Sequence, residues 1–145
     1  MNNERINLAR LKSDLYQHCE ECNQNDNCVE HECLVGYALL CIDYANKSGT
    51  TLIAGGDKLI PMHDAKPYNL EFVAEGLAQT CIECKNCMDN HTSDCVIALS
   101  RNCLEFAYLQ QPLPYSGNVI TYLVDLAARD AALAQKTKEA FQYKK

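Results

Sequence analysis

Ten cysteines are the residues of this chain whose chemistry stands out, because thiolates bind soft metals and take part in redox reactions. They are Cys19, Cys22, Cys28, Cys33, Cys41, Cys81, Cys84, Cys87, Cys95 and Cys103. Four lie within residues 19–33 and four within residues 81–95, and each group begins with a CxxC pair. Several sulfur donors that converge on one point suit zinc, copper(I) or an iron–sulfur cluster. The sequence therefore predicts two metal sites, one in each group.

The two groups of cysteines repeat at a constant spacing of 62 residues. The matched pairs are Cys19 with Cys81, Cys22 with Cys84, Cys33 with Cys95 and Cys41 with Cys103. Over residues 7–45 this offset gives 10 identities, and self-similarity of this kind indicates a duplicated structural unit. We therefore predict two structural repeats, at about residues 2–47 and about residues 64–109. Cys28 and Cys87 break the register.

Each half has five cysteines for four expected ligands, so two assignments compete. In the loop set, the ligands are Cys19, Cys22, Cys28 and Cys33, then Cys81, Cys84, Cys87 and Cys95. Cys41 and Cys103 are then buried apolar residues. In the offset-matched set, Cys41 and Cys103 are ligands, while Cys28 and Cys87 are spare thiols. The repeat favours the second set, but Cys33 and Cys41 are about 12 Å apart along a helix, which favours the first. We favour the offset-matched set and treat all ten cysteines as candidate ligands.

The spacing of the cysteines favours iron–sulfur clusters over zinc. Cys81, Cys84 and Cys87 form a CxxCxxC run, a spacing that is found in bacterial ferredoxins. The likeness extends over these few residues alone, because Cys95 lies further on and is followed by Val96 instead of proline. Zinc ribbons bring two CxxC pairs, about 15–20 residues apart, into one site, whereas these pairs are 62 residues apart. We therefore predict two [4Fe-4S] clusters, with zinc as the alternative.

The four histidines are the other candidate zinc ligands. They are His18, His31, His63 and His91. Only His18 adjoins a cysteine, and none is matched at the 62-residue offset, so we interpret them as solvated residues of loops or helix surfaces. The chain has no dinucleotide-binding glycine motif, no phosphate-binding loop and no zinc-protease motif. Catalysis by this chain alone is therefore not expected.

Charge and hydropathy narrow the expected partners and compartment. The net charge of −6 argues against a nucleic-acid or anionic membrane surface, since both attract positive charge. No apolar run approaches the roughly 18 residues of a membrane span, and the polar N-terminus is unlike a signal peptide. We expect a cytoplasmic protein with reduced thiols.

The local charge differs between the two cysteine groups. Residues 20–32 carry five carboxylates without a cation, whereas residues 82–94 carry three carboxylates and Lys85. The second site is therefore predicted to have the higher reduction potential.

Helical periodicity surrounds both cysteine groups. Apolar residues recur at helical spacing before each CxxC pair, and again after Cys33 and Cys95. The predicted fold is mainly α, with two pseudo-equivalent helix–Cys loop–helix repeats in a single domain of residues 1–145. A short β-hairpin is expected between the repeats at about residues 50–62, with Gly55-Gly56 at its turn. A C-terminal helix is expected at about residues 117–142, capped by residues 116–118.

These expectations favour an iron–sulfur protein that transfers electrons or serves as the accessory small subunit of a larger redox enzyme. The partner would be that enzyme or another electron-transfer protein. Two further functions fit the same cysteines. One is a helical protein-interaction module stapled by zinc, and the other is a metal store or cluster scaffold, for which five thiols per site would be an advantage.

Overall fold

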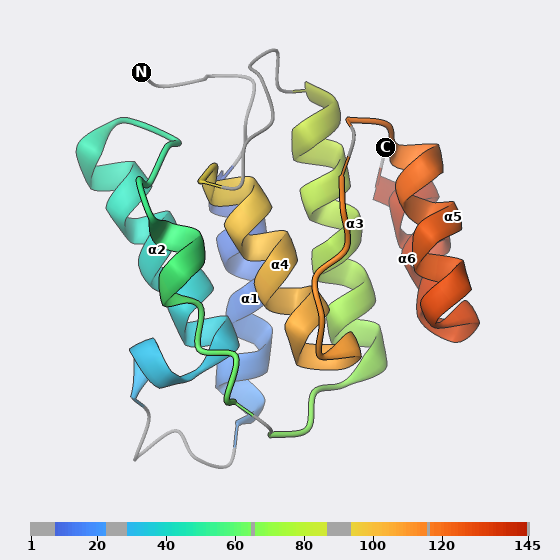
Figure 1. Cartoon of the computed structure of the whole chain (residues 1–145), viewed down its shortest axis with the longest axis horizontal. Coiled ribbons are helices and arrows are strands. Elements are labelled where there is room, and N and C mark those ends of the chain that lie inside the picture. Colours follow the sequence, from blue (N-terminus) through green and yellow to red (C-terminus); the bar gives the residue numbers. More distant parts are fainter. Residues whose placement is uncertain (1–7, 23–28, 65, 87–93, 116, 145) are drawn as a thin grey trace.

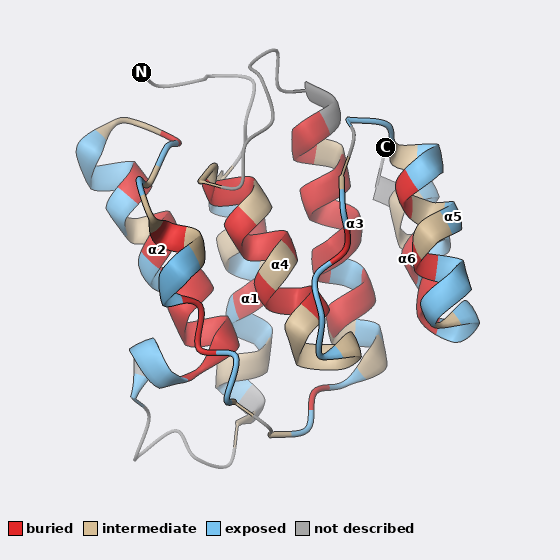
Figure 2. Cartoon of the chain, in the orientation of Figure 1, coloured by how far each residue is buried: buried red, intermediate tan, exposed pale blue. Residues whose placement is uncertain are grey.

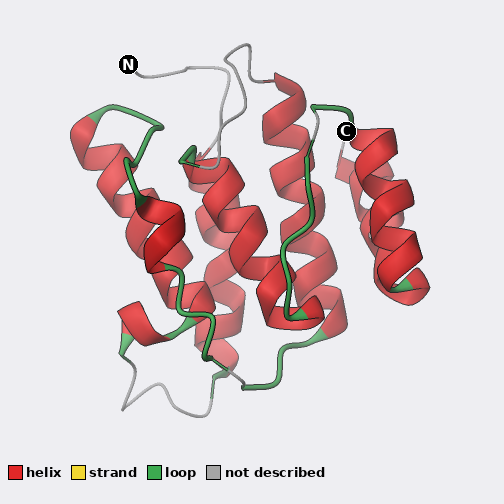
Figure 3. Cartoon of the chain, in the orientation of Figure 1, coloured by secondary structure: helices red, strands yellow, loops and turns green. Residues whose placement is uncertain are grey.

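The computed structural model describes residues 8–22, 29–64, 66–86, 94–115 and 117–144. Six α-helices account for most of them: α1 (Leu8–Glu21), α2 (Leu34–Ser48), α3 (Leu70–Asn86), α4 (Val96–Leu109), α5 (Val119–Arg129) and α6 (Ala131–Lys144). Two short 3-10 helices, η2 (Glu30–Glu32) and η3 (Gly56–Leu59), lie in the connections. The described residues contain no strand longer than an isolated bridge (Figure 3), so the prediction of a mainly helical fold is confirmed.

The first four helices form a bundle in which α1 packs on α2 and α3, and α4 packs on the same two helices. His18 near the end of α1 contacts Phe72 near the start of α3, so these two helices run antiparallel. Helices α5 and α6 pair with each other, and α6 packs against α3 on the outside of the bundle (Figure 1). Consequently the C-terminal pair covers one flank of α3 and leaves its own outer face open.

The core of the bundle holds the apolar residues that helical spacing predicts. Leu11, Leu15, Leu77 and Leu104 are fully buried, and the buried positions of each helix face the interior of the bundle (Figure 2). Burying a leucine side chain contributes about 1.5–3 kcal/mol to folding, so these positions fix how the helices pack. In the part of the chain that the structure describes, no helix is both long and apolar enough to cross a lipid bilayer.

Two helices of the predicted repeats begin at matching positions. Helix α2 begins at Leu34 and α4 at Val96, 62 residues apart, and α3 begins at Leu70, 62 residues after Leu8, which is the first described residue of α1. Cys33 and Cys95 are the N-cap residues of α2 and α4. The stronger claim, that the two halves are equivalent in three dimensions, stays a prediction.

The predicted β-hairpin at residues 50–62 is wrong. Leu52 forms its single bridge with Cys95, far away in the sequence, and Gly56 begins the 3-10 helix η3. The two glycines have a different purpose from a hairpin turn. Gly55 has a left-handed backbone, with φ of 74°, and a Cβ atom on Gly56 would lie only 2.8 Å from Leu99 Cδ1 of α4. Glycine is therefore required where this segment crosses closely over α4.

The predicted single C-terminal helix is replaced by two helices that meet at Asp130. Its predicted start is confirmed, because Asn118 caps α5 by accepting a hydrogen bond from the N–H of Thr121 at 3.0 Å. Asp130 has an extended backbone, and its carboxylate accepts a hydrogen bond from the N–H of Leu133 at 2.9 Å. Aspartate is a strong N-cap residue, so it ends α5 and starts α6. The chain can then reverse direction and form the antiparallel pair.

Candidate functional site

The structure distributes the predicted ligands between two opposite ends of the bundle. Cys19 lies in the last turn of α1, Cys22 follows that helix, and Cys33 caps α2. Cys81 and Cys84 lie in the last turns of α3, and Cys95 caps α4. Because Cys84 is 14 residues after the start of α3, it lies about 21 Å along that helix from the end of α1. We call the end with Cys19, Cys22 and Cys33 end one, and the end with Cys81, Cys84 and Cys95 end two.

Two predicted ligands lie midway along helices instead of at the ends of the bundle, and two lie outside the described residues. Cys41 of α2 and Cys103 of α4 are 4% and 1% exposed. Burial raises the pKa of both thiols, for Cys103 well above its ordinary value, so both favour the neutral form. Cys28 and Cys87 belong to segments outside the described residues.

The eight described cysteines are all free thiols. Across the described ranges, no three side chains of His, Cys, Asp or Glu lie close enough together to hold one metal ion. The choice between the loop set and the offset-matched set of ligands therefore stays a prediction.

At end two, a buried cation lies against a cysteine. Arg101 of α4 is 3% exposed, and its Nη1 donates a hydrogen bond to Cys84 Sγ at 3.0 Å. The guanidinium also lies 4.0 Å from the centroid of the Tyr115 ring, a cation–π contact that holds it in place. A positive charge next to sulfur stabilises the thiolate, which is the form that binds metals. Burial raises the pKa of neighbouring Cys81 to about 12, although the charge of Arg101 opposes this shift.

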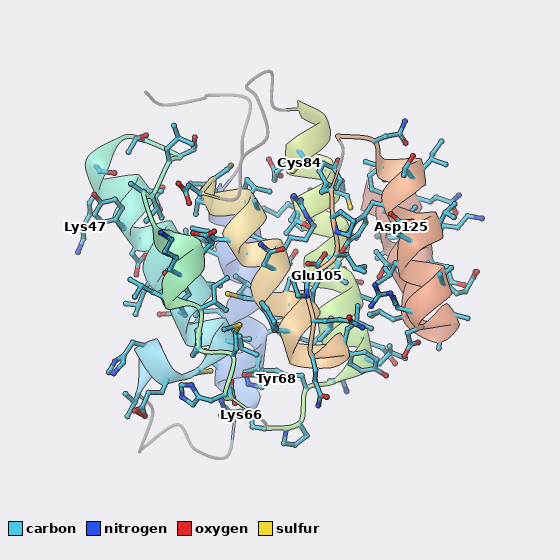
Figure 4. The ribbon with its side chains drawn as sticks, in the orientation of Figure 1. Lys47, Lys66, Tyr68, Cys84, Glu105 and Asp125 are labelled. Carbon is cyan, nitrogen blue, oxygen red and sulfur yellow. The ribbon has the colours of Figure 1, made fainter. Side chains whose placement is uncertain are left out.

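A buried carboxyl group lies one helical turn beyond the arginine. Glu105 has no exposed surface, and its two oxygens accept hydrogen bonds from Tyr122 Oη at 2.6 Å and from the N–H of Leu113 at 3.0 Å. Burial raises the pKa of Glu105 to about 7, although these hydrogen bonds and Arg101 oppose the shift. Glu105 thereby connects α4 with α5 and with the segment that precedes it (Figure 4).

At end one, a polar cluster surrounds the start of α2. The Asp64 carboxylate accepts hydrogen bonds from the N–H of Leu34, from Tyr68 Oη and from Lys66 Nζ. Burial alone would raise the pKa of Asp64, but these hydrogen bonds leave it below its usual value. Tyr68 Oη is also 3.6 Å from Cys33 Sγ. Lys66 and Tyr68 lie at the bottom of Figure 4, and Cys84 lies toward the top.

The histidines differ from one another in their surroundings. His31 and His63 are exposed, as predicted, and His91 is outside the described residues. His18 lies on the surface of α1 but is half-buried, because its ring packs against those of Tyr68 and Phe72 at centroid distances of 4.7 and 5.3 Å. His18, Tyr68 and Phe72 therefore form an aromatic cluster near end one.

The chain has no match among protein-family models, curated proteins or solved structures.

Two groups of candidate functional residues are not apparent from the cysteine pattern. The first is Arg101 with Glu105, and the second is Asp64 with Lys66 and Tyr68. A signal for the first exists in the sequence, because two charges of opposite sign at i and i+4 interrupt an otherwise uncharged helix. Buried charges are rare unless they are paired, so such an interruption indicates a site.

Proposed function

We propose that the protein is a small iron–sulfur protein with one [4Fe-4S] cluster at each end of the four-helix bundle. It would transfer electrons or act as the accessory small subunit of a larger redox enzyme. The observation that carries this proposal is the position of the cysteines. At each end, a CxxC pair that closes one helix lies at the same end of the bundle as the cysteine that caps the next helix. The equal spacing of the helix starts supports two equivalent halves.

The surroundings of the cysteines favour the loop set of ligands. Cys41 follows the N-cap residue Cys33 by eight residues, so the two cysteines are about 12 Å apart along the axis of α2. Burial raises the pKa of Cys41 and of Cys103, and no cation of the described residues is among the causes that shift either value. Cys84, in contrast, has Arg101 at hydrogen-bond distance. Cys28 and Cys87 would supply the fourth ligand at each end.

Each end also has a cation beside a cysteine. Arg101 contacts Cys84 at end two. At end one, burial lowers the pKa of Lys66, but its hydrogen bond to Asp64 and the nearby Cys33 raise it overall. Positive charge at these positions would offset the negative charge of a cluster that four thiolates hold.

Metal and sulfide analysis tests this function. We expect protein purified without oxygen to be brown, to bleach on reduction and to contain about eight iron and eight sulfide ions per chain. Cys84→Ser should remove about half of the iron, because it removes one ligand of one cluster. Cys103→Ser is the matched control on the neighbouring helix, and the loop set predicts that it keeps all of the iron.

Other results of the same analysis would assign a different function. Colourless protein with tightly bound zinc and no sulfide would identify a zinc-stapled interaction module, which the exposed aliphatic residues of α5 favour as second candidate. Variable amounts of several thiophilic metals, easily released, would identify a metal store or scaffold. Protein that binds no metal would contradict all three functions.

The two clusters should differ in reduction potential. Arg101 is buried beside Cys84, whereas the charge of Lys66 is shared with Asp64 at 2.9 Å. A buried positive charge at hydrogen-bond distance from a ligand favours the reduced, more negative cluster, so the cluster at end two should be reduced first. Arg101→Gln should lower the potential of that cluster alone, Arg101→Lys should lower it less, and Lys66→Gln should change the other cluster only slightly. Potentiometric titration followed by electron paramagnetic resonance measures both. Equal potentials in the wild type would contradict this prediction.

A further inference from the structure

A groove runs between α5 and α6. It encloses about 1040 Å³, and its walls come from both helices of the antiparallel pair. Cys84 of α3 also lines it, so the groove reaches end two of the bundle. Asp125, which Figure 4 labels on α5, lies on the same helix but is not among the lining residues.

Helix α5 has two apolar faces, and the fold uses one of them. Tyr122 and Leu126 are buried against the rest of the protein. A second stripe at i, i+3, i+4 and i+7, formed by Ile120, Leu123, Val124 and Ala127, lines the groove. Ile120 is 74% exposed and Val124 is 63% exposed. A stripe with this period is the pattern by which a helix packs against another helix.

Helix α6 forms the opposite wall of the groove. Ala131, Ala134, Lys138 and Phe141 face the groove at helical spacing. The alanines lie near the turn between the two helices, where short side chains let a third helix approach closely. The groove therefore has the shape and spacing that receive an amphipathic helix, as in helix-in-groove recognition.

The charge of the groove indicates what kind of helix fits. Lys138 is the charged residue among the described lining residues, and none of these described residues carries a carboxylate. Gly117, Asn118 and Val119 line the end near the start of α5, where a helix N-terminus attracts negative charge. Residues 117–145 hold five cations and three carboxylates, whereas residues 1–116 hold eight and sixteen. A second copy that docked with the same groove would bring two Lys138 side chains together, whereas an acidic helix would bring carboxylates to Lys138, so these charges favour an acidic partner.

We propose that the groove between α5 and α6 binds an amphipathic helix of a partner protein, with apolar side chains on the stripe of α5 and carboxylates toward Lys138 and the start of α5. Because Cys84 lines the groove, the bound helix covers end two. If Cys84 holds a cluster, as the proposed function requires, this partner is the one that exchanges electrons with it.

A synthetic helical peptide of about 18 residues, with a leucine stripe and glutamates on its flanks, tests the surface directly. The protein is prepared without metal, and fluorescence anisotropy gives the Kd. We expect saturable binding by the acidic peptide and at least about tenfold weaker binding by the same peptide with lysines in place of glutamates. Val124→Glu and Lys138→Glu should each weaken binding of the acidic peptide about tenfold. Leu59→Glu, at an equally exposed aliphatic residue of η3, should not. Circular dichroism checks that all variants fold.

Several outcomes would overturn the proposal. They are absence of binding, equal binding of both peptides, or an equal loss with Leu59→Glu. Self-association of the metal-free protein that Val124→Glu abolishes would assign the groove to a second copy. A separate measurement tests whether the bound peptide covers end two. Bound peptide should slow the alkylation of Cys84 and leave the alkylation of Cys22, at end one, unchanged. Equal alkylation rates with and without peptide would refute coverage of end two. Since every measurement uses metal-free protein, failure of the cluster assignment leaves these results intact.

Discussion

The free energy of unfolding should fall by about 3 kcal/mol between pH 4.5 and pH 7 because of Glu105 alone. Burial raises the pKa of Glu105 to about 7 in the folded protein, against an ordinary value of 4.5. Across that interval the unfolded chain releases the proton while the folded protein keeps it, so rising pH favours unfolding. Each pH unit corresponds to 1.36 kcal/mol, and a difference of about 2.5 units gives the expected loss. The contribution is complete below pH 4.5 and absent above pH 7.

Glu105→Gln isolates this effect from the titration of other groups. The amide is neutral at all of these pH values, and its oxygen can still accept the hydrogen bond from the N–H of Leu113. We expect the variant and the wild type to have similar stability at pH 4.5, and the variant to be more stable at pH 8. Urea unfolding at several pH values measures the difference. Glu139→Gln, at an exposed position of α6, controls for the removal of one carboxylate. A constant difference between Glu105→Gln and the wild type would refute the prediction.

Apolar periodicity predicts the four helices of the bundle because their packing faces depend on local spacing. Leu15 and Leu77 lie at matching positions of the two repeats, and both are fully buried. Periodicity could not predict how η3 crosses α4. The segment around Gly55-Gly56 has the composition of a turn, but its geometry depends on contact with Leu99, which is distant in sequence. Periodicity could not predict the break at Asp130 either. A capping residue inside a helical pattern ends the helix only if the following segment, here α6, can fold back onto α3.

The sequence predicts which cysteines form the candidate sites, but it does not predict which charged residues contact them. Spacing alone separates the cysteines into two groups, and the structure distributes the described members of these groups between opposite ends of the bundle. The contact between Arg101 and Cys84 joins two helices across 17 residues of sequence, so no local pattern contains it. Lys66 is positioned near Cys33 by the fold of the connection between the halves. The chemistry of each end therefore depends on tertiary packing more than on the cysteine motif.

Leu104→Ala should lower the free energy of unfolding by about 3 kcal/mol, since truncation of a fully buried leucine leaves a cavity. The neighbouring position gives a sharper test of how α3 packs on α4. A Cβ atom on Gly76 would lie 2.6 Å from Leu104 Cδ1 and 3.6 Å from its Cγ. Gly76→Ala should therefore destabilise the wild type, even though alanine is about 1 kcal/mol better than glycine within a helix.

The sign of the Gly76→Ala effect should reverse once Leu104 is truncated. In Leu104→Ala protein the atoms that oppose the new methyl group are gone, so the methyl group enters the cavity and the helical preference of alanine is gained. The double variant should then be more stable than Leu104→Ala by about 1 kcal/mol, and the double-mutant cycle should give a coupling energy well above the roughly 0.5 kcal/mol of independent sites. Chemical denaturation of the four proteins measures it. The prediction is contradicted if Gly76→Ala has the same effect in both backgrounds. In that case α3 and α4 do not meet at these two residues. The packing of α3 on α4 that brings Arg101 to Cys84 would then be wrong as well.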